Sequence, residues 1–245
     1  AINQAQHEVL LETYIFDFQG AALDVAHAVT RAAQRGVRVM LVVDGAGTGA
    51  LPELWRQRWD EVGVQHRVYA PITAPEFWKP LRWRRLHRKL CVVDQRIGFC
   101  GGVNLLDDWL DPHDDVRLPA PRLDYAVRVQ GPVVQSLHDT MRQLWSRIEA
   151  VRELKEKDIA KALDALLGAE QLTSLHKGGA VKLVLRDNVR HRVDIERSYR
   201  RAIAKAKHSI VLASAYFFPG VRLLRALVMA AQRGVRVQLL LQGHY

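Results

Sequence analysis

The sequence has few of the features by which several protein classes are recognised. It holds two cysteines, Cys91 and Cys100, and neither belongs to a C-x-x-C or other metal-binding spacing. This argues against a disulfide framework or a cysteine zinc site, and we expect buried, reduced thiols as in a cytosolic protein. No stretch of eighteen apolar residues occurs, so we expect no segment that spans a bilayer. No signal-peptide pattern opens the sequence either.

Acidic residues are also in short supply. The 26 Asp and Glu residues stand against 36 Lys and Arg, which gives a net charge of +10 and a pI near 9.9. Such a surface attracts polyanions, either nucleic acid or an anionic membrane. Charge alone does not distinguish between these two partners.

One basic segment, residues 78–86 (WKPLRWRRL), combines cations with two tryptophans. Tryptophan favours the lipid interface and basic residues favour anionic headgroups. The same mixture could stack bases and pair phosphates, or form a solvated loop that packs its aromatic rings on the domain. We favour an approach surface for substrate because the segment directly precedes His87. The residues expected to face a membrane are Trp78, Lys79, Arg82, Trp83, Arg84 and Arg85.

The most informative segment is residues 87–94 (HRKLCVVD), which has the pattern H-x-K-x4-D. Its apolar, branched residues predict a buried strand over 86–93, followed by a turn at 94–96 and a partner strand over 97–100. Residues two apart on a strand share a face, so His87 and Lys89 are expected to point the same way. Such a pair is more often only a solvated strand face, but here it is followed by further polar groups.

A pair of glycines, Gly101 and Gly102, and then Asn104 follow the predicted hairpin. The glycines let backbone or ligand approach closely. We expect an imidazole, an ammonium and an amide to converge, and this combination suits a phosphate. The imidazole can attack phosphorus while Lys89 and Asn104 neutralise the oxygens around it.

The chain also contains an internal repeat. Residues 1–11 match residues 202–212, and residues 32–39 are identical to residues 230–237, at offsets of 201 and 198. Each copy reads as the end of a helix, an apolar strand, a loop, a helix stopped by glycine, and a second strand. These offsets place a second copy of the motif beyond Tyr245 and part of the first unit before Ala1. We therefore expect an interior piece of a longer protein.

Together these segments resemble the phospholipase D superfamily, whose motif reads H-x-K-x4-D and then G-[GS]-x-N. More of the chain is similar to one branch, the bacterial cardiolipin synthases of the B type. The supporting segments are residues 12–16 (ETYIF), 33–39 (AQRGVRV), 124–127 (DYAV), 186–188 (RDN) and 215–220 (AYFFPG).

Alternating strands and helices predict an α/β fold. The resemblance implies a phospholipase D-like repeat, with a mixed β-sheet flanked by helices, as one full unit and the start of a second. We expect a first unit over 1–150, a charged helical linker over 151–179 and the start of the second unit over 180–245.

The resemblance also implies roles for single residues. His87 is expected to form a phosphohistidine, while a histidine of a second motif protonates the leaving alcohol. Asp124 is placed to hold the imidazole in the correct tautomer, unless it is an edge-strand acid paired with Arg122 or Arg128. Asp94 belongs to the motif, but its strand parity and turn position indicate support rather than contact with phosphate. No metal or other cofactor is expected, because lysine and asparagine supply the charge.

Other residues are expected to shape the substrate pocket. Gly101 and Gly102 form part of its wall, and Glu12, which interrupts an apolar strand, is expected to point into the cleft. Tyr216 and Phe218 belong to the first strand of the second unit and would line its side.

The leading hypothesis is a phosphatidyl transferase that makes cardiolipin from phosphatidylglycerol and a second phospholipid. It would bind an anionic phospholipid membrane peripherally, on the cytoplasmic face of the bacterial inner membrane, and would not act on nucleic acid. One alternative is a phosphodiesterase of the same superfamily that does act on nucleic acid, and another is a non-catalytic membrane-binding module. The sequence leaves the oligomeric state open.

Overall fold

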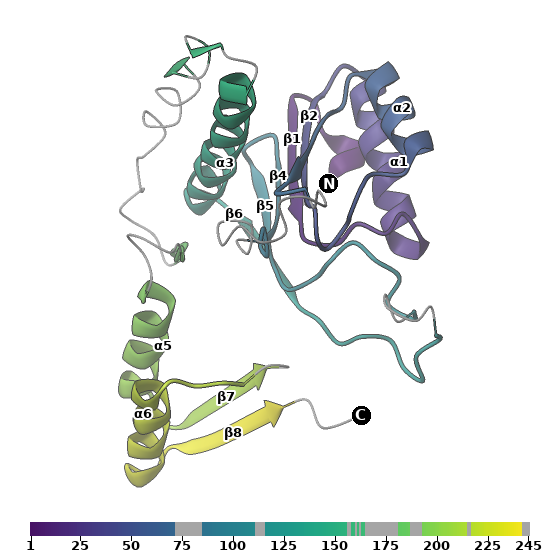
Figure 1. Cartoon of the computed structure of the whole chain (residues 1–245). Coiled ribbons are helices and arrows are strands. Elements are labelled where there is room, and N and C mark those ends of the chain that lie inside the picture. The colour runs from purple at the N-terminus through teal and green to yellow at the C-terminus, as the bar shows by residue number, and fades with distance from the viewer. Residues whose placement is uncertain are drawn as a thin grey trace. The chain divides into compact units, whose positions relative to one another are not determined.

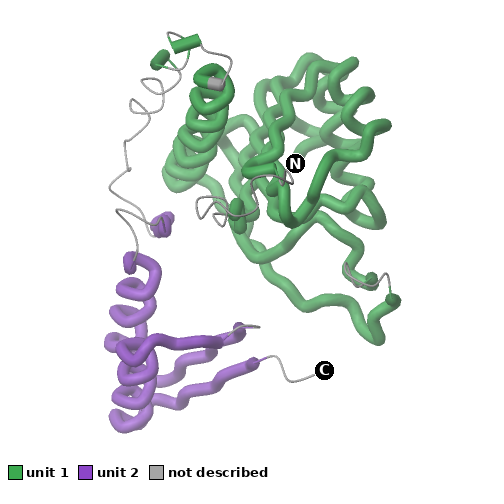
Figure 2. Tube along the Cα trace, viewed as in Figure 1, with its two compact units in different colours: residues 1–181 green, residues 182–245 purple. Residues whose placement is uncertain are grey.

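A computed structural model describes residues 1–71, 85–110, 116–155, 158–159, 161, 163–164, 181–186, 193–214 and 217–241. The chain forms two compact units, residues 1–181 and 182–245 (Figure 2). Most of the linker predicted over residues 151–179 lies outside the described residues, so that division stays a prediction.

The described part of the first unit is built on a six-stranded mixed sheet, in the order β3-β2-β1-β4-β5-β6 (Figure 1). Its first three strands run parallel, and the pairs β1–β4, β4–β5 and β5–β6 are antiparallel. The strands are β1 (Glu8–Thr13), β2 (Arg38–Asp44), β3 (Gln65–Tyr69), β4 (Lys89–Val93), β5 (Ile97–Gly101) and β6 (Ala126–Gln130). The mixed sheet predicted from the sequence is confirmed.

Helices cover both faces of this sheet. The helices α1 (Gly20–Gln34) and α2 (Glu53–Val62) lie on one face, and α3 (Val133–Lys155) lies on the other (Figure 1). All six residues of β1 are buried, because both faces of this central strand are covered. The core beneath α1 and α2 includes Val9, Val29, Leu41 and Trp59, so the apolar residues of neighbouring strands and helices bury one another.

The second unit repeats the beginning of the first. It consists of α5 (Asp194–Lys205), β7 (Ser209–Ser214), α6 (Val221–Gln232) and β8 (Arg236–Leu241), with β7 and β8 parallel. Its small core is centred on Ile203, Leu227, Ala230 and Val235.

Glycines end the matching helices of the two units, as the repeat predicted. Gly36 follows α1 with φ of +83°, and Gly234 follows α6 with φ of +85°. This left-handed conformation costs a glycine little, because it has no Cβ to meet the preceding turn. The predicted helix ends are therefore confirmed in both units.

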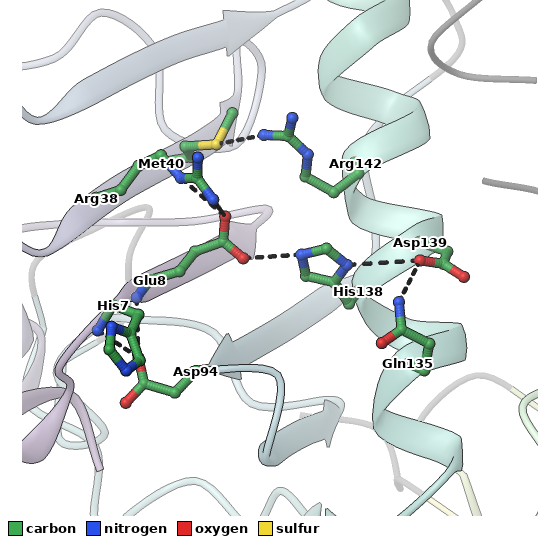
Figure 3. A network of polar contacts seen from close by, with 9 residues as sticks. All are labelled: His7, Glu8, Arg38, Met40, Asp94, Gln135, His138, Asp139 and Arg142. Atoms are coloured by element: carbon green, nitrogen blue, oxygen red, sulfur yellow. Dashed lines mark hydrogen bonds and ion pairs between the residues drawn. The ribbon is translucent and has the colours of Figure 1, made fainter. Parts of the chain in front are cut away.

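A network of buried polar groups ties α3 to the start of β1 (Figure 3). The carboxylate of Glu8 accepts from Arg38 Nη2 at 2.6 Å and contacts His138 Nε2 at 2.8 Å. Burial alone would raise the pKa of Glu8, but the bond and charge of His138 and the Arg38 guanidinium hold it below its usual value. This ionic contact anchors α3 near the end of β1 that lies beside the β4–β5 turn.

Candidate active site

The site is built around His87 and Lys89, at the beginning of β4. His87 lies two residues before the first residue of the strand and is exposed, whereas Lys89 is that first residue and is buried. Lys89 Nζ lies 3.3 Å from His87 Nε2 and 3.4 Å from Nδ1, and donates to the His87 carbonyl at 3.2 Å. The strand begins two residues later than His87, but the two side chains point toward one another.

Tyr14 completes this cluster from the end of β1. Its ring centroid lies 4.9 Å from that of His87, and Lys89 Nζ lies 5.4 Å from the Tyr14 centroid. An ammonium at this distance from an aromatic face is attracted by the ring quadrupole. Tyr14 therefore helps to fix both side chains, a role that its place in an apolar segment did not reveal.

The surroundings favour the uncharged form of His87. Desolvation by burial and the positive charge of Lys89 lower the pKa of His87, and the nearby Asp44 carboxylate opposes them. Burial also lowers the pKa of Lys89, against the charge of Asp124. A neutral imidazole keeps a lone pair, so His87 is in the form that can act as a nucleophile near neutral pH.

Asp44 is a residue of the site that the sequence interpretation missed. It ends β2, is fully buried, and accepts the Leu86 backbone N–H at 2.7 Å just before His87. Its other carboxylate oxygen accepts from Ala46 N at 2.7 Å and Gly47 N at 3.3 Å. An acid at the carboxyl end of an apolar strand is the signal that could have identified it, because polar groups of a site often lie there.

Asn104 lies in the segment after β5, which is bonded to the segment after β1. Its Oδ1 accepts the Ile15 backbone N–H at 3.2 Å, and the backbone N–H of Leu105 donates to the Ile15 carbonyl at 3.0 Å. Because Oδ1 faces a donor, the amide orientation is set and the NH2 group remains as a donor. This orientation suits contact with an anionic oxygen.

The glycine pair makes room for the segment just before β6, which carries Asp124. A Cβ at Gly101 would lie 2.3 Å from the Tyr125 carbonyl oxygen, and one at Gly102 would lie 2.2 Å from Asp124 Oδ1. At Gly101 the neighbour is backbone, so the close approach requires glycine, whereas at Gly102 the neighbour is the end of the Asp124 side chain. The charge of Asp124 acts on Lys89, and its predicted role in orienting His87 stays a prediction.

Asp94 lies at the opposite end of β4 from His87. Its carboxylate accepts from the backbone N–H groups of Gln6 at 2.9 Å and of His7 and Glu8 at 2.8 Å each. Burial would raise the pKa of Asp94, but these three hydrogen bonds hold it below its usual value. Although the motif groups it with the reacting residues, its contacts fix the start of β1 against the β4–β5 turn.

Glu12 is buried and already has a partner. Its side chain is 2% exposed and pairs with Arg88, with Nε–Oε2 at 2.5 Å and Nη2–Oε1 at 3.0 Å. Burial raises the pKa of Glu12, opposed by Arg88, and Arg88 Nη2 also donates to the Thr140 carbonyl at 3.3 Å. Arg88, which lies between the two motif side chains, thus occupies the carboxylate, and the predicted role of Glu12 in binding substrate stays a prediction.

Some of the predicted residues lie outside the part of the chain that the structure describes, and others have contacts away from His87. Trp78, Lys79, Arg82, Trp83, Arg84 and Tyr216 lie outside the described residues. Arg85 donates to the Ala70 carbonyl at 3.2 Å, and Phe218 is 89% exposed in the second unit. The two cysteines are unpaired and only half-buried, and burial raises the pKa of the Cys91 thiol to about 12.

The described residues lack two kinds of feature. They hold no cluster of three or more His, Cys, Asp or Glu side chains arranged to bind a metal ion. None of the described helices combines the length and the apolar character needed to cross a membrane.

The mixed sheet and the H-x-K-x4-D strand with its glycine pair define a phospholipase D-like domain. The family model for the cardiolipin synthase, phospholipase D-like domain matches residues 1–145 and 199–245, and the chain belongs to that family.

Named relatives agree with this assignment. The chain is 34% identical to cardiolipin synthase B of Shigella flexneri and to that of Escherichia coli K12, over 99% of this chain and 56% of each relative. It is 27% identical to the cardiolipin synthase of Halalkalibacterium halodurans, over 98% of this chain and 45% of the relative. The chain thus spans about half the length of these relatives.

Solved structures share the fold at low sequence identity. The phosphatidylserine synthase of Haemophilus influenzae matches with a TM-score of 0.60 and 12% identity, over 98% of this chain and 57% of that one. A polyphosphate kinase of Porphyromonas gingivalis matches with a TM-score of 0.52 and 14% identity, over 98% and 34%. At these identities the similarity establishes the fold class.

Proposed function

We propose that this chain carries the nucleophilic half of a phosphatidyl transferase that makes cardiolipin from phosphatidylglycerol and a second phospholipid. The observation that carries the proposal is the position of the His87 imidazole, whose Nε2 lies 3.3 Å from Lys89 Nζ, in surroundings that lower the pKa of His87. A nucleophile beside a fixed cation suits attack on a phosphodiester, whose negative charge must be neutralised as the phosphorus is approached. The names of the relatives support phospholipids as the substrates.

In the proposed reaction, a nitrogen of His87 attacks the phosphorus of a phosphatidyl donor. The bond from phosphorus to the first alcohol breaks, and that alcohol leaves with a proton from a general acid. The hydroxyl of phosphatidylglycerol then attacks the phosphohistidine, loses its proton to the same group, and releases His87. Two displacements at phosphorus conserve the energy of the phosphodiester, so the exchange needs no nucleotide.

The neighbouring residues divide the supporting roles. Lys89 and the NH2 group of Asn104 neutralise the non-bridging oxygens, while Asp44 stabilises the cation that His87 becomes. Gly101 and Gly102 keep the pocket open. The charge of Asp124 stabilises the ammonium of Lys89 or, as predicted from the sequence, orients the imidazole of His87. Asp94 fixes the end of β4 that lies away from His87.

We place the general acid in a second motif of the whole protein. The repeat between residues 1–39 and 202–237 supports this, since one motif per repeat would supply two histidines. In this interpretation residues 1–150 form the first unit, 151–179 a linker and 180–245 the start of the second.

We further propose peripheral binding to an anionic membrane, on the cytoplasmic face of the bacterial inner membrane. The net charge of +10 supports attraction to anionic lipid. The basic, tryptophan-bearing segment before His87 would then bring the site to the phospholipid headgroups.

The test is the mass of the chain joined to a second motif, which supplies the proposed general acid, after brief incubation with phosphatidylglycerol vesicles; the chain without that motif is expected to be inactive. We expect a phosphatidyl adduct that is acid-labile, as a phosphoramidate bond is, and that maps to His87. His87→Ala should abolish the adduct, and Lys89→Met should reduce it at least ~100-fold, because a donor to developing charge is worth roughly that much. His7→Ala, which changes an exposed histidine outside the site, is the matched control and should retain it.

Other outcomes point to the alternatives. An adduct that forms with an oligonucleotide but not with lipid would favour the nuclease hypothesis. Vesicle binding without any adduct, in the chain joined to its second motif, would favour a non-catalytic membrane module.

A further inference from the structure

The segment that carries His87 lies just before the point where β4 joins the sheet. Residues 85–88 lie outside the strand. Within the described residues, the ladder of β4 begins at Lys89 with β5 and at Leu90 with β1. The position of His87 therefore depends on how its two neighbours in the chain are held.

Buried carboxylates from two other strands hold both of these neighbours. Asp44, at the end of β2, accepts the backbone N–H of Leu86 at 2.7 Å. Glu12, near the end of β1, accepts from Arg88 Nε at 2.5 Å and from Nη2 at 3.0 Å. Both carboxylates belong to buried residues. The chain is thus fixed immediately before and immediately after His87.

The Arg88 guanidinium also reaches the helix on the α3 face of the sheet. Its Nη2 group donates to the Thr140 carbonyl in the middle of α3 at 3.3 Å. A planar guanidinium with two bonds to one carboxylate allows little variation in direction, unlike a single flexible bond. Arg88 therefore joins β1, α3 and the start of β4 at one place. That place is the residue between His87 and Lys89.

The same sheet contains a second pair of this chemistry. Glu8 lies four residues before Glu12 on β1, so the two carboxylates share a face of the strand. Arg38 donates to Glu8 with Nε at 3.0 Å and Nη2 at 2.6 Å (Figure 3). Glu8 is also buried, but it lies at the end of β1 away from His87. The two pairs differ mainly in what they are attached to.

We propose that Glu12 and Arg88 form a positioning pair for the candidate active site. The pair fixes the backbone between the two motif side chains, and so holds the His87 imidazole beside Lys89 for attack on phosphorus. In this role Glu12 acts through Arg88 and not by contact with substrate. The chemical step rests on the proposed function, whereas the placement of His87 beside Lys89 can be measured without any substrate.

The central test replaces both partners with apolar side chains, as Glu12→Leu combined with Arg88→Met. Replacing a whole buried ion pair in this way often leaves stability unchanged, so the melting temperature should stay within about 4 °C of wild type. In the chain joined to its second motif, the phosphatidyl adduct should nevertheless form about 100-fold more slowly at saturating lipid. A displacement of about 1 Å in a reacting group can cost that much.

A second measurement follows His87 itself by NMR in the chain labelled with isotopic histidine. The chain has 10 histidines, and His87→Ala assigns the signal. Burial and the charge of Lys89 lower the pKa of His87, against Asp44. In the double variant the pKa of His87 should rise toward its ordinary value, because the imidazole is no longer held there. Arg88→Lys, which keeps the charge without the fork, should give an intermediate result in both measurements.

The Glu8 pair provides the matched control. Glu8→Gln and Glu12→Gln each remove one buried negative charge from β1 and keep the size of the side chain. Glu12→Gln should slow adduct formation and shift the titration of His87. Glu8→Gln should leave both unchanged, although it alters the contacts that anchor α3. These single variants also keep the test decisive if the double variant does not fold.

The proposal is overturned if the double variant forms the adduct at the wild-type rate and His87 titrates as before. It is also overturned if Glu8→Gln slows the reaction as much as Glu12→Gln, because the effect would then be general. A higher lipid requirement with an unchanged maximal rate in Glu12→Gln would assign Glu12 to substrate binding instead. If the wild type forms no adduct, the proposed function fails, and the titration of His87 alone decides on the pair.

Discussion

The two units contain the same sequence pattern in very different surroundings. Residues 32–39 and 230–237 are identical, and each forms a helix end, a glycine with positive φ and the start of a parallel strand. Yet β1 is buried throughout, whereas its counterpart β7 alternates between exposed and half-buried residues. Local structure follows the local sequence, but burial depends on what the rest of the chain places on either side.

The difference has a definite source. In the first unit, β1 pairs with β4 as well as β2, and α3 covers the far face of the sheet. In the described part of the second unit, β7 pairs with β8 alone. The candidate site lies on elements that the described part of the second unit does not have. His87 and Lys89 lie at the beginning of β4, and Asn104 follows β5.

The largest expected effect is a loss of stability at one leucine that is buried in the first unit and exposed at the matching position of the second. Leu41 on β2 is fully buried, and its counterpart Leu239 on β8 is 43% exposed. Leu41→Ala should cost about 3 kcal/mol of unfolding free energy through lost burial and a cavity. Leu239→Ala should cost less than about 1 kcal/mol. Hydrogen exchange resolved by unit measures both, and equal losses would contradict this account of the two units.

A second effect concerns the start of β1. Asp94→Asn keeps the size of the side chain but removes its charge and one acceptor, and should cost the first unit about 1–2 kcal/mol. The amides of Gln6, His7 and Glu8 should then exchange faster, while their counterparts at 207–209 should not change. Asp24→Asn is the control, because the structure records no hydrogen bond of the Asp24 side chain within the described residues. It should leave the stability of the first unit unchanged.

The same substitution has a pH dependence with a definite sign. The folded-state pKa of Asp94 lies below its usual value, so its contribution is fully present above the unfolded pKa, which is about 4. The contribution is lost as pH falls through the lower folded pKa. Denaturation experiments from pH 7 to pH 2 measure the free energy of unfolding of wild type and of Asp94→Asn. The difference between these two free energies should become smaller below about pH 4. A difference that stays constant with pH would exclude the carboxylate charge as its cause.

The smallest effect tests the feature that the units share most closely. Arg35→Ala and Arg233→Ala should each lower the free energy of unfolding by about 0.5–1 kcal/mol. Each change removes hydrogen bonds from a guanidinium to backbone carbonyls, those of Ile2 and Ala5 for Arg35 and those of Ile203 and Ala204 for Arg233. Thermal melts followed by unit-resolved exchange can measure these losses. A loss of stability in the second unit without one in the first would show that the two arginines are not equivalent.

Comparison with the sequence interpretation shows which residues were hard to place. The β4–β5 hairpin and its turn were predicted correctly, since apolar alternation and turn residues act over a few positions. Asp44 and the pairing of Glu12 were missed, because each depends on a partner far along the chain. Asp44 bonds to Leu86 N, and Glu12 pairs with Arg88. No local pattern contains such contacts.

The sequence by itself determined the repeat, the glycine-stopped helices, the motif strand and the residue types that suit phosphate chemistry. These follow from periodicity and from the conformational limits of glycine, which operate between near neighbours. The tertiary structure decided which acid lies near His87, how Asn104 is turned, and in which direction the pKa values of His87 and Lys89 shift. Those properties depend on burial and on distances between separate strands, and the pKa of a group responds to both.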